Sequence, residues 1–380
     1  ALDARARGLR AVAITSNFAP IRPDLEVRAE AIFRAVMPDA RITLSHQVGG
    51  LGLIDRESAA VINASMAALA ESIVGSLVQA FASLGIAAPI FISQNDGTLI
   101  TTAQAATYPI FTCSAGPTNS IRGAAFLTGL DEAVVADIGG TTTDVGFLSR
   151  GFPRETAMPK LIGGVRTNFR MPDILSIGLG GGSVVRAGES ECEVGPDSVG
   201  HRLQTEALAF GGSTLTATDI AIAAGQATIG EPSRVAGLTH AMVGAALDRI
   251  HRLVEEAIDR MKTSEQPLPL ILVGGGAILI NRPVAGTSRV LRPDHATVAN
   301  AVGAAIALVS GRVDKLYDVA ALGRDAALDM AKAEARAAAV AAGAAEATVE
   351  VIEVVELPMT HMKAGTTQIR VRAVGELAEL

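Results

Sequence analysis

Residues 133–148 read AVVADIGGTTTDVGFL, and this stretch decides the fold. Two apolar β-runs, 133–138 and 143–148, stand on either side of a short polar turn, which predicts a β-hairpin. The two glycines of the turn let the backbone approach an anion without a Cβ in the way. Backbone N–H groups and threonine hydroxyls then supply the donors. The turn is therefore predicted to bind phosphate groups through Gly139, Gly140, Thr141, Thr142 and Thr143; an ordinary glycine-rich hairpin is the alternative.

Acidic residues flank this turn on both sides. Asp137 ends the first β-run, where its carboxylate can hold a Mg²⁺-bound water or orient an attacking nucleophile. Asp144 begins the returning run and can do either job less directly. We therefore expect Asp137 and Asp144 to be catalytic and Asp137 to be the metal ligand.

Two more glycine clusters follow apolar runs. The sequence ILVGGGA, 271–277, predicts a buried strand that ends in Gly274, Gly275 and Gly276, where a base or ribose can lie against bare backbone. A tight strand–helix turn is the alternative. The sequence SIGLGGGS, 176–183, has the same form. It predicts a phosphate-side wall made of Gly180, Gly181, Gly182 and Ser183, with a flexible turn as the equal alternative.

Composition narrows the class of protein. The chain has 380 residues, of which 49% are hydrophobic and 19% charged, so it predicts two or three folded domains and excludes wholesale disorder. The net charge of −7 argues against binding to nucleic acid or to an anionic membrane, and the absence of Trp with only 3% aromatic residues argues against base stacking on single-stranded nucleic acid. Cys113 and Cys192 are too few for a disulfide framework, so we expect free thiols and a cytoplasmic protein. No apolar run reaches the ~18 residues of a membrane helix.

Strand-like and helix-like segments alternate along the chain, which predicts an α/β fold with a largely parallel sheet. The predicted strands are 11–16, 41–45, 89–94, 174–178 and 269–274. The predicted helices are 24–36, 55–84 (one helix or two), 116–129, 232–262, 294–310 and 330–343, and 347–374 is mostly strand-like.

Weaker candidates lie outside the glycine clusters. Asn119 and Arg122 precede the hairpin and are candidates for a phosphate or substrate carboxylate, against a helix start with a surface arginine. Arg166 and Asn168 are candidates for substrate contact, against a solvated loop. The histidines show no metal-ligand spacing and are expected to be surface or core side chains: His46, His201, His240, His251, His295 and His361.

Together these motifs resemble the actin, sugar-kinase and heat-shock ATPase superfamily. Within it the chain is similar to the hydantoinase A/5-oxoprolinase family, whose motifs it carries in family order. The matching stretches are SHQVGGLGLIDRESA (45–59), SQNDGTL (93–99), SAGPTNSIRGAAFL (114–127), DIGGTTTDVG (137–146), GGVRTNFRMPDILSIGLGGGS (163–183), VGPDSVG (194–200), GGSTLTATDIAIAAG (211–225), LVGGGA (272–277) and ANAVGAA (299–305).

The resemblance implies an actin-like ATPase fold of the ribonuclease H-like kind, with two domains and mixed sheets. Family members usually begin with a first D-x-G-G-T hairpin, whereas this sequence has one such motif, so an N-terminal segment is expected to be missing and the first domain incomplete. The expected ranges are 1–130 for the rest of the first domain, 131–320 for the second, and 321–380 for a small C-terminal α+β tail.

The resemblance also implies a chemistry. An enzyme of this kind uses ATP and Mg²⁺, with Mn²⁺ as an alternative, and opens a five-membered cyclic amide such as a hydantoin or 5-oxoproline by phosphorylating the amide oxygen. The expected partners are a hydantoinase B-type subunit or the missing N-terminal segment, and a homo-oligomer is also open. Two alternatives remain: a kinase-like phosphotransferase acting on a small hydroxylated substrate, and a non-catalytic subunit of a hydantoinase-type complex.

Overall fold

The computed structural model describes residues 1–156, 160–169, 171–187, 192–359 and 365–378. The chain divides into two compact units. Unit 1 comprises residues 1–115, 155–171 and 307–380, and unit 2 comprises residues 116–154 and 172–306. These units differ from the expected contiguous ranges, because the C-terminal segment folds with the N-terminal one. Each unit is described by itself.

Unit 2 is built on a mixed sheet whose strand order is β10-β6-β5-β13-β14. Its strands are β5 (Ala133–Ile138), β6 (Thr143–Ser149), β10 (Ile174–Ile177), β13 (Leu268–Val273) and β14 (Thr287–Leu291). The predicted hairpin is β5–β6, and β10 extends it antiparallel on the outer side of β6. On the inner side, β13 runs parallel to both β5 and β14. The sheet is therefore mixed, as the family resemblance implied.

Helices cover both faces of this sheet, which explains why β5 is apolar at consecutive positions. Val135 packs with α6 (Ala115–Thr128) on one face, and Val134 packs with α9 (His240–Met261) and α8 (Ala217–Ala223) on the other. The predicted helix 232–262 is a 3₁₀ turn, Pro232–Val235, followed by α9. The hairpin β11 (Ser183–Ala187) and β12 (Cys192–Ser198) follows β10.

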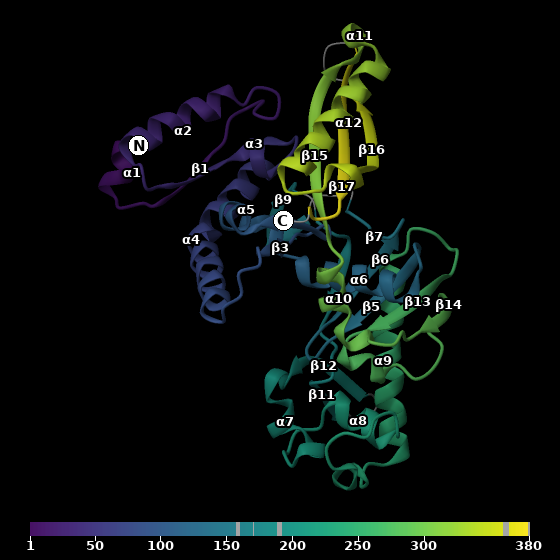
Figure 1. Ribbon diagram of the computed structural model, residues 1–380. Coiled ribbons are helices and arrows are strands. Elements are labelled where there is room, and N and C mark those ends of the chain that lie inside the picture. Colours follow the sequence, from purple (N-terminus) through teal and green to yellow (C-terminus); the bar gives the residue numbers. More distant parts are fainter. Residues whose placement is uncertain (157–159, 170, 188–191, 360–364, 379–380) are drawn as a thin grey trace. The chain divides into compact units, whose positions relative to one another are not determined.

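Unit 1 contains a five-stranded sheet of order β16-β17-β15-β4-β3. Its strands are β3 (Phe91–Ser93), β4 (Thr98–Thr101), β15 (Leu308–Asp318), β16 (Glu350–Pro358) and β17 (Thr366–Gly375). The alanine-rich α12 (Arg324–Ala341) packs on β15 and β17 (Figure 1). Since β15 pairs with both β4 and β17, the C-terminal segment completes a sheet that the N-terminal segment begins.

The predicted helix 294–310 is wrong at its C-terminal end. Helix α10 (Ala299–Ala305) stops early, and β15 begins at Leu308, which pairs in parallel with Thr98 of β4. Local sequence favoured a longer helix there, but pairing with strands distant in sequence converts these residues to strand.

The rest of unit 1 is a parallel pair, β1 (Ala11–Ile14) and β2 (Arg41–Leu44), with α2 (Asp24–Val36) and α4 (Leu53–Ser83). Shorter elements complete the chain: α1 (Leu2–Ala6), α3 (Ser45–Val48), α5 (Thr102–Thr107), α7 (Leu203–Glu206), α11 (Val319–Leu322), β7 (Phe152–Pro153), β8 (Lys160–Ile162) and β9 (Val165–Thr167).

Helix α4 is one continuous helix of 31 residues. Its first half carries buried residues such as Ala59, Ala60 and Asn63, while Leu69 and Ile73 in its second half are exposed. Of the helices that the structure describes, this one is long and apolar enough to cross a bilayer, judged by length and composition only. The expectation that no segment reaches that length is therefore wrong, although the core helix of a soluble protein passes the same test.

Candidate functional site

The predicted phosphate turn of unit 2 is open to a ligand. Asp137 pairs with Asp144 across the β5–β6 hairpin, and the N–H of Gly139 closes the turn on the carbonyl of Thr142 at 2.9 Å. Residues 140–142 are exposed. Within the described ranges, the N–H groups of these three residues donate to no other group. The turn therefore presents three N–H donors and two threonine hydroxyls to an incoming anion.

The third glycine cluster lies behind this turn. The N–H groups of Gly181 and Gly182 donate to the carbonyls of Gly139 and Gly140 at 3.0 and 2.7 Å. A Cβ on Gly180 would lie 2.5 Å from the backbone nitrogen of Thr141. These glycines are buried, and the two N–H groups are already committed. Their observed contribution is to support the turn rather than to line its open side.

Side chains on either side of this cluster fix its position. The buried Thr143 hydroxyl donates to the carbonyl of Leu179 at 2.7 Å, and the Ser183 hydroxyl accepts from the N–H of Gly180 at 2.8 Å. Thr143 is fully buried, so its hydroxyl serves the loop and is not presented to a ligand. Of the three predicted threonine donors, Thr141 and Thr142 remain on the open side.

The second glycine cluster lies beside the same turn. Because β13 is parallel to β5, with Val273 opposite Asp137, both strands reach the same edge of the sheet. Gly274 has φ +83°, and a Cβ there would lie 2.4 Å from both Oδ1 of Asp137 and the carbonyl of Ile138. Gly275 is exposed and has nothing within 4 Å of its Cβ position. The clusters at 139–143 and 274–276, distant in sequence, are therefore adjacent.

The carboxylates of this edge occupy neighbouring strands. Asp144 also faces Ser176 of β10, whose hydroxyl hydrogen-bonds to its Oδ1. Burial raises the pKa of Asp144; the Ser176 hydrogen bond opposes this rise, and the charge of Asp137 adds to it. Two carboxylates beside a phosphate-sized turn suit Mg²⁺, which is usually held by one or two carboxylates together with phosphate oxygens and water. Among the described residues, no group of three His, Cys, Asp or Glu side chains forms a metal site from protein alone.

Two weaker candidates of unit 2, Asn119 and Arg122, lie on α6. The Arg122 guanidinium bonds to the carbonyl of Gly151 and lies 4.1 Å from the ring centroid of Phe152, at the opposite end of the β5–β6 hairpin. Asn119 is 6% exposed in α6, and its carbonyl lies 1.9 Å from the Cβ position of Gly303 in α10. Both residues serve the packing around α6.

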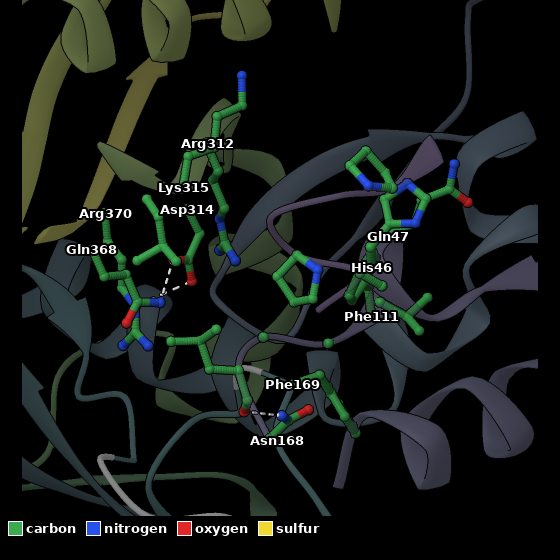
Figure 2. Close-up of a pocket in the computed structure, with 18 of the residues that line it drawn as sticks. His46, Gln47, Phe111, Asn168, Phe169, Arg312, Asp314, Lys315, Gln368 and Arg370 are labelled. Atoms are coloured by element: carbon green, nitrogen blue, oxygen red, sulfur yellow. Dashed lines mark hydrogen bonds and ion pairs between the residues drawn. The ribbon is translucent and has the colours of Figure 1, made fainter. Parts of the chain in front are cut away.

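The other two candidates belong to unit 1. Arg166 is exposed and pairs with Asp55 at 3.2 Å. Asn168 donates to the carbonyl of Leu51 at 2.6 Å and lines a cavity of about 530 Å³. Figure 2 shows residues of β15 and β17 on one side of this cavity and residues 46, 47 and 111 on the other. The polar side chains that line it are His46, Gln47, Thr156, Asn168, Arg312, Asp314, Lys315, Gln368 and Arg370.

Sequence reasoning missed most of this cavity. Gln368 donates to Asp314 at 2.6 Å, and Arg370 pairs with the same carboxylate at 3.1 Å. These residues lie on paired strands, β15 and β17, so only the sheet brings them together. The available signals were Asn168 and the SHQVGG stretch, 45–50, which supplies the opposite wall.

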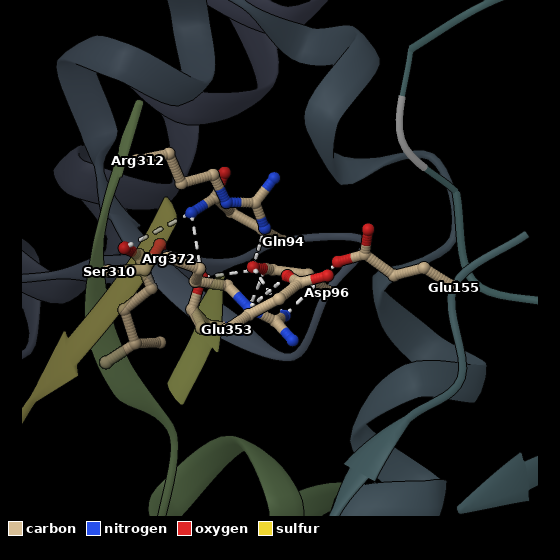
Figure 3. Close-up of polar contacts among 9 residues, drawn as sticks. Gln94, Asp96, Glu155, Ser310, Arg312, Glu353 and Arg372 are labelled. Atoms are coloured by element: carbon tan, nitrogen blue, oxygen red, sulfur yellow. Dashed lines mark hydrogen bonds and ion pairs between the residues drawn. The ribbon is translucent and has the colours of Figure 1, made fainter. Parts of the chain in front are cut away.

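A buried charge cluster, shown in Figure 3, anchors one wall of this cavity. The Asp96 side chain, 3% exposed, accepts from the N–H and hydroxyl of Thr98 at 3.1 and 2.7 Å, and its second oxygen contacts Arg312 and Arg372. Arg372 also pairs with Glu155 at 3.2 Å. Burial, together with the charge of Arg372, lowers the pKa of Arg312 to about 9, so its guanidinium is still protonated at neutral pH.

Comparison with known proteins finds similar sequences. The Hydantoinase/oxoprolinase family model matches residues 56–231. The chain is 26% identical over 259 residues to caprolactamase subunit alpha of Pseudomonas jessenii, covering 67% of this chain and 37% of that protein. It is 25% identical over 233 residues to the gamma subunit of acetophenone carboxylase of Aromatoleum aromaticum, covering 58% and 31%. The chain thus spans about a third of the length of these relatives.

Two solved structures share the fold across the whole chain. One is the ATP-dependent caprolactamase of Pseudomonas jessenii, with a TM-score of 0.78 and 17% identity, covering 100% of this chain and 66% of that one. The other is a nucleotide-free acetone carboxylase, with a TM-score of 0.68 and 16% identity, covering 99% and 66%. The chain therefore has the actin-like ATPase fold, and the resemblance to the hydantoinase/oxoprolinase family that its motifs indicate is confirmed.

Proposed function

We propose that this chain is the ATP-using part of an enzyme that opens a cyclic amide. The observation that carries the proposal is the meeting of residues 139–142 and 274–276 at one edge of the unit 2 sheet. The first stretch offers N–H and hydroxyl donors to a polyphosphate. The second offers the exposed Gly275, with open space above it, for the adenosine.

In this proposal the turn holds the phosphates while Asp137, assisted by Asp144, holds Mg²⁺ or its bound water. Mg²⁺ would neutralise charge on the transferred phosphoryl group. The γ-phosphoryl group passes to the amide oxygen of the substrate and ADP leaves. Water then adds at the activated carbon and the C–N bond breaks, which leaves an acyl phosphate of the ring-opened amino acid. A second water molecule hydrolyses this acyl phosphate, and the products are the ring-opened amino acid and inorganic phosphate. Positioning and charge neutralisation would supply most of the rate.

The substrate class rests on the relatives. A caprolactamase is similar to this chain both in sequence and in structure, which favours a lactam or hydantoin. A second candidate, ATP-dependent carboxylation of a small ketone, is favoured by the acetophenone carboxylase and acetone carboxylase similarities. Both relatives matched in sequence are named as subunits, so we also propose that a partner subunit completes the enzyme.

A product-resolved assay tests the proposal. The native enzyme that contains this chain is incubated with Mg·ATP and a panel of lactams and hydantoins, and separately with small ketones and bicarbonate. Ring-opened product with inorganic phosphate supports the amidase, and a carboxylated ketone supports the second candidate. A stable phosphorylated product would instead indicate a kinase, and absence of ATP binding would indicate a non-catalytic subunit.

A further inference from the structure

A buried carboxylate in unit 1 makes four hydrogen bonds, with Ser16, Ser45 and His46. Glu26 of α2 is 0% exposed. Its Oε1 accepts from the N–H of Ser16 at 2.8 Å and from the hydroxyl of Ser45 at 2.5 Å. Its Oε2 accepts from the N–H of His46 at 3.1 Å and contacts the ring Nδ1 of His46 at 2.7 Å. Both oxygens of the carboxylate are therefore saturated with donors.

Arg56 of α4 fixes the same region from the other side. Its guanidinium is 2% exposed and donates to the Ser45 hydroxyl at 2.9 Å, to the carbonyl of Gly50 at 3.1 Å and to the carbonyl of Ser16 at 2.8 Å. Burial by itself would raise the pKa of Glu26, but the hydrogen bonds, that from His46 the largest and that from Ser45 the next, outweigh it and lower this pKa. Glu26 is therefore ionised at neutral pH.

An ionised Glu26 fixes the tautomer of His46. A carboxylate only accepts, so Nδ1 carries the proton that faces it, and in the neutral ring Nε2 is left as an acceptor. The His46 side chain is 19% exposed and lines the 530 Å³ cavity. Within the described part of the chain, Nε2 has no hydrogen-bond partner. Nε2 of His46 is therefore a basic nitrogen at the cavity, and the buried carboxylate of Glu26 fixes the orientation of the ring.

We propose that His46 is the proton-transfer residue of this cavity, and that Glu26 is the positioning residue that holds it in the basic tautomer. This inference rests on the proposed function, because it places the cyclic amide in the cavity. The oxygen of a water molecule forms a bond to the activated amide carbon while one of its protons passes to Nε2. Glu26 stabilises the resulting imidazolium. The same proton then passes to the ring nitrogen of the substrate as the C–N bond breaks.

Other charges around the cavity bear on this proton transfer. Among the described residues, these charges are Glu26 of α2, Arg56 of α4, Arg312, Asp314 and Lys315 of β15, and Arg370 of β17. Asp314 is bonded to Gln368 and Arg370, and Lys315 is paired with Glu334 at 2.5 Å. The carboxylate in direct contact with the imidazole is Glu26, and for this reason we assign the positioning role to it.

The test replaces His46 by asparagine in the native enzyme, since an asparagine amide can still donate to Glu26 but offers no basic nitrogen. Turnover is expected to fall by about 100-fold or more, the range lost with a general base. The dissociation constant for ATP and the circular dichroism spectrum are expected to stay unchanged. His240→Gln, at an exposed position of α9 in unit 2, is the matched control and should leave turnover unchanged.

Two further readouts separate proton transfer from a structural role. Imidazole added to His46→Ala should restore activity in proportion to the concentration of its neutral form. Nitrogen NMR of the wild-type ring in its neutral form should show Nδ1 protonated and Nε2 unprotonated. Three results would overturn this inference without affecting the proposed function. They are a His46→Asn variant that turns over lactam as fast as the wild-type enzyme, an absence of imidazole rescue, and the opposite tautomer of the ring. A wild-type enzyme inert towards every lactam would instead overturn the proposed function.

Discussion

Gly274→Ala is the substitution whose consequence the structure specifies most closely. Residue 274 has φ +83° and ψ 162°, a conformation that is essentially restricted to glycine and costs other residues about 1–3 kcal/mol. The new methyl group would also lie 2.4 Å from Oδ1 of Asp137 and from the carbonyl of Ile138. Overpacking of this kind costs about 1–3 kcal/mol more. The free energy of unfolding of unit 2 should therefore fall by about 2–6 kcal/mol, and Asp137 should be displaced.

The neighbouring residue is the matched control. Gly275 has no positive φ and no atom within 4 Å of its Cβ position, so Gly275→Ala should change stability by less than about 0.5 kcal/mol. Gly275→Val should also fold normally, but its side chain would enter the space proposed for the adenosine. We expect it to weaken ATP binding by at least about tenfold, or 1.4 kcal/mol.

Urea unfolding followed by circular dichroism measures the stabilities, because the chain has no Trp and only two Tyr for fluorescence. Isothermal calorimetry with Mg·ATP measures the affinities. Equal stability of Gly274→Ala and Gly275→Ala would refute the reasoning about the backbone. Unchanged ATP affinity in Gly275→Val would move the adenosine away from this edge.

Three further predictions concern the same edge. Asp137→Asn should lower ATP-dependent turnover by about 100-fold or more with an unchanged circular dichroism spectrum, and full activity would remove Asp137 from its role. Thr143→Val removes the donor to the Leu179 carbonyl and should cost about 1–3 kcal/mol of stability, whereas Thr143→Ser should not; similar urea midpoints for the two variants would contradict this. Because the pKa of Asp144 is raised above the ordinary 3.8, the folded chain holds this proton to higher pH than the unfolded chain, and the free energy of unfolding falls as pH rises through that window. Asp144→Asn should remove that part of the slope in urea titrations at a series of pH values, and an unaltered slope would count against the raised pKa.

Local sequence carried the information for the hairpin. Two β-runs around Gly-Gly-Thr-Thr need only a short-range turn, and the structure places β5 and β6 within a residue of the expected ends. The glycine cluster at 274–276 could likewise be recognised in the sequence. Glycine is needed there because of the backbone conformation and because other atoms lie close to the Cβ positions. The physical cause of the adjacency of the two stretches is the parallel register of β5 and β13.

Contacts between residues far apart in the sequence could not be predicted from local patterns. The strand β15 was read in part as helix because Leu308 and its neighbours become strand only through β4 and β17. The Glu26–His46 pair joins a helix to the segment after β2, twenty positions apart, with no periodic spacing to reveal it. Asp96 lay within a quoted motif, but its partners Arg312 and Arg372 are more than two hundred residues away in sequence.

Arg122 shows the opposite error. A cationic side chain shortly before a phosphate hairpin was a natural candidate for phosphate contact. The helix α6 instead runs beside the hairpin, so its later residues reach the far end of β6, where Arg122 meets Gly151 and Phe152. Proximity in sequence to a functional turn therefore did not translate into proximity in space.

The central claim is that the turn after β5, residues 139–142, binds a polyphosphate. Amide NMR tests this claim most directly. Titration of the nitrogen-15-labelled chain with a non-hydrolysable Mg·ATP analogue should shift the amide signals of Gly140, Thr141 and Thr142 together with that of Gly275. Saturable binding that leaves these four signals in place while others move would contradict the account.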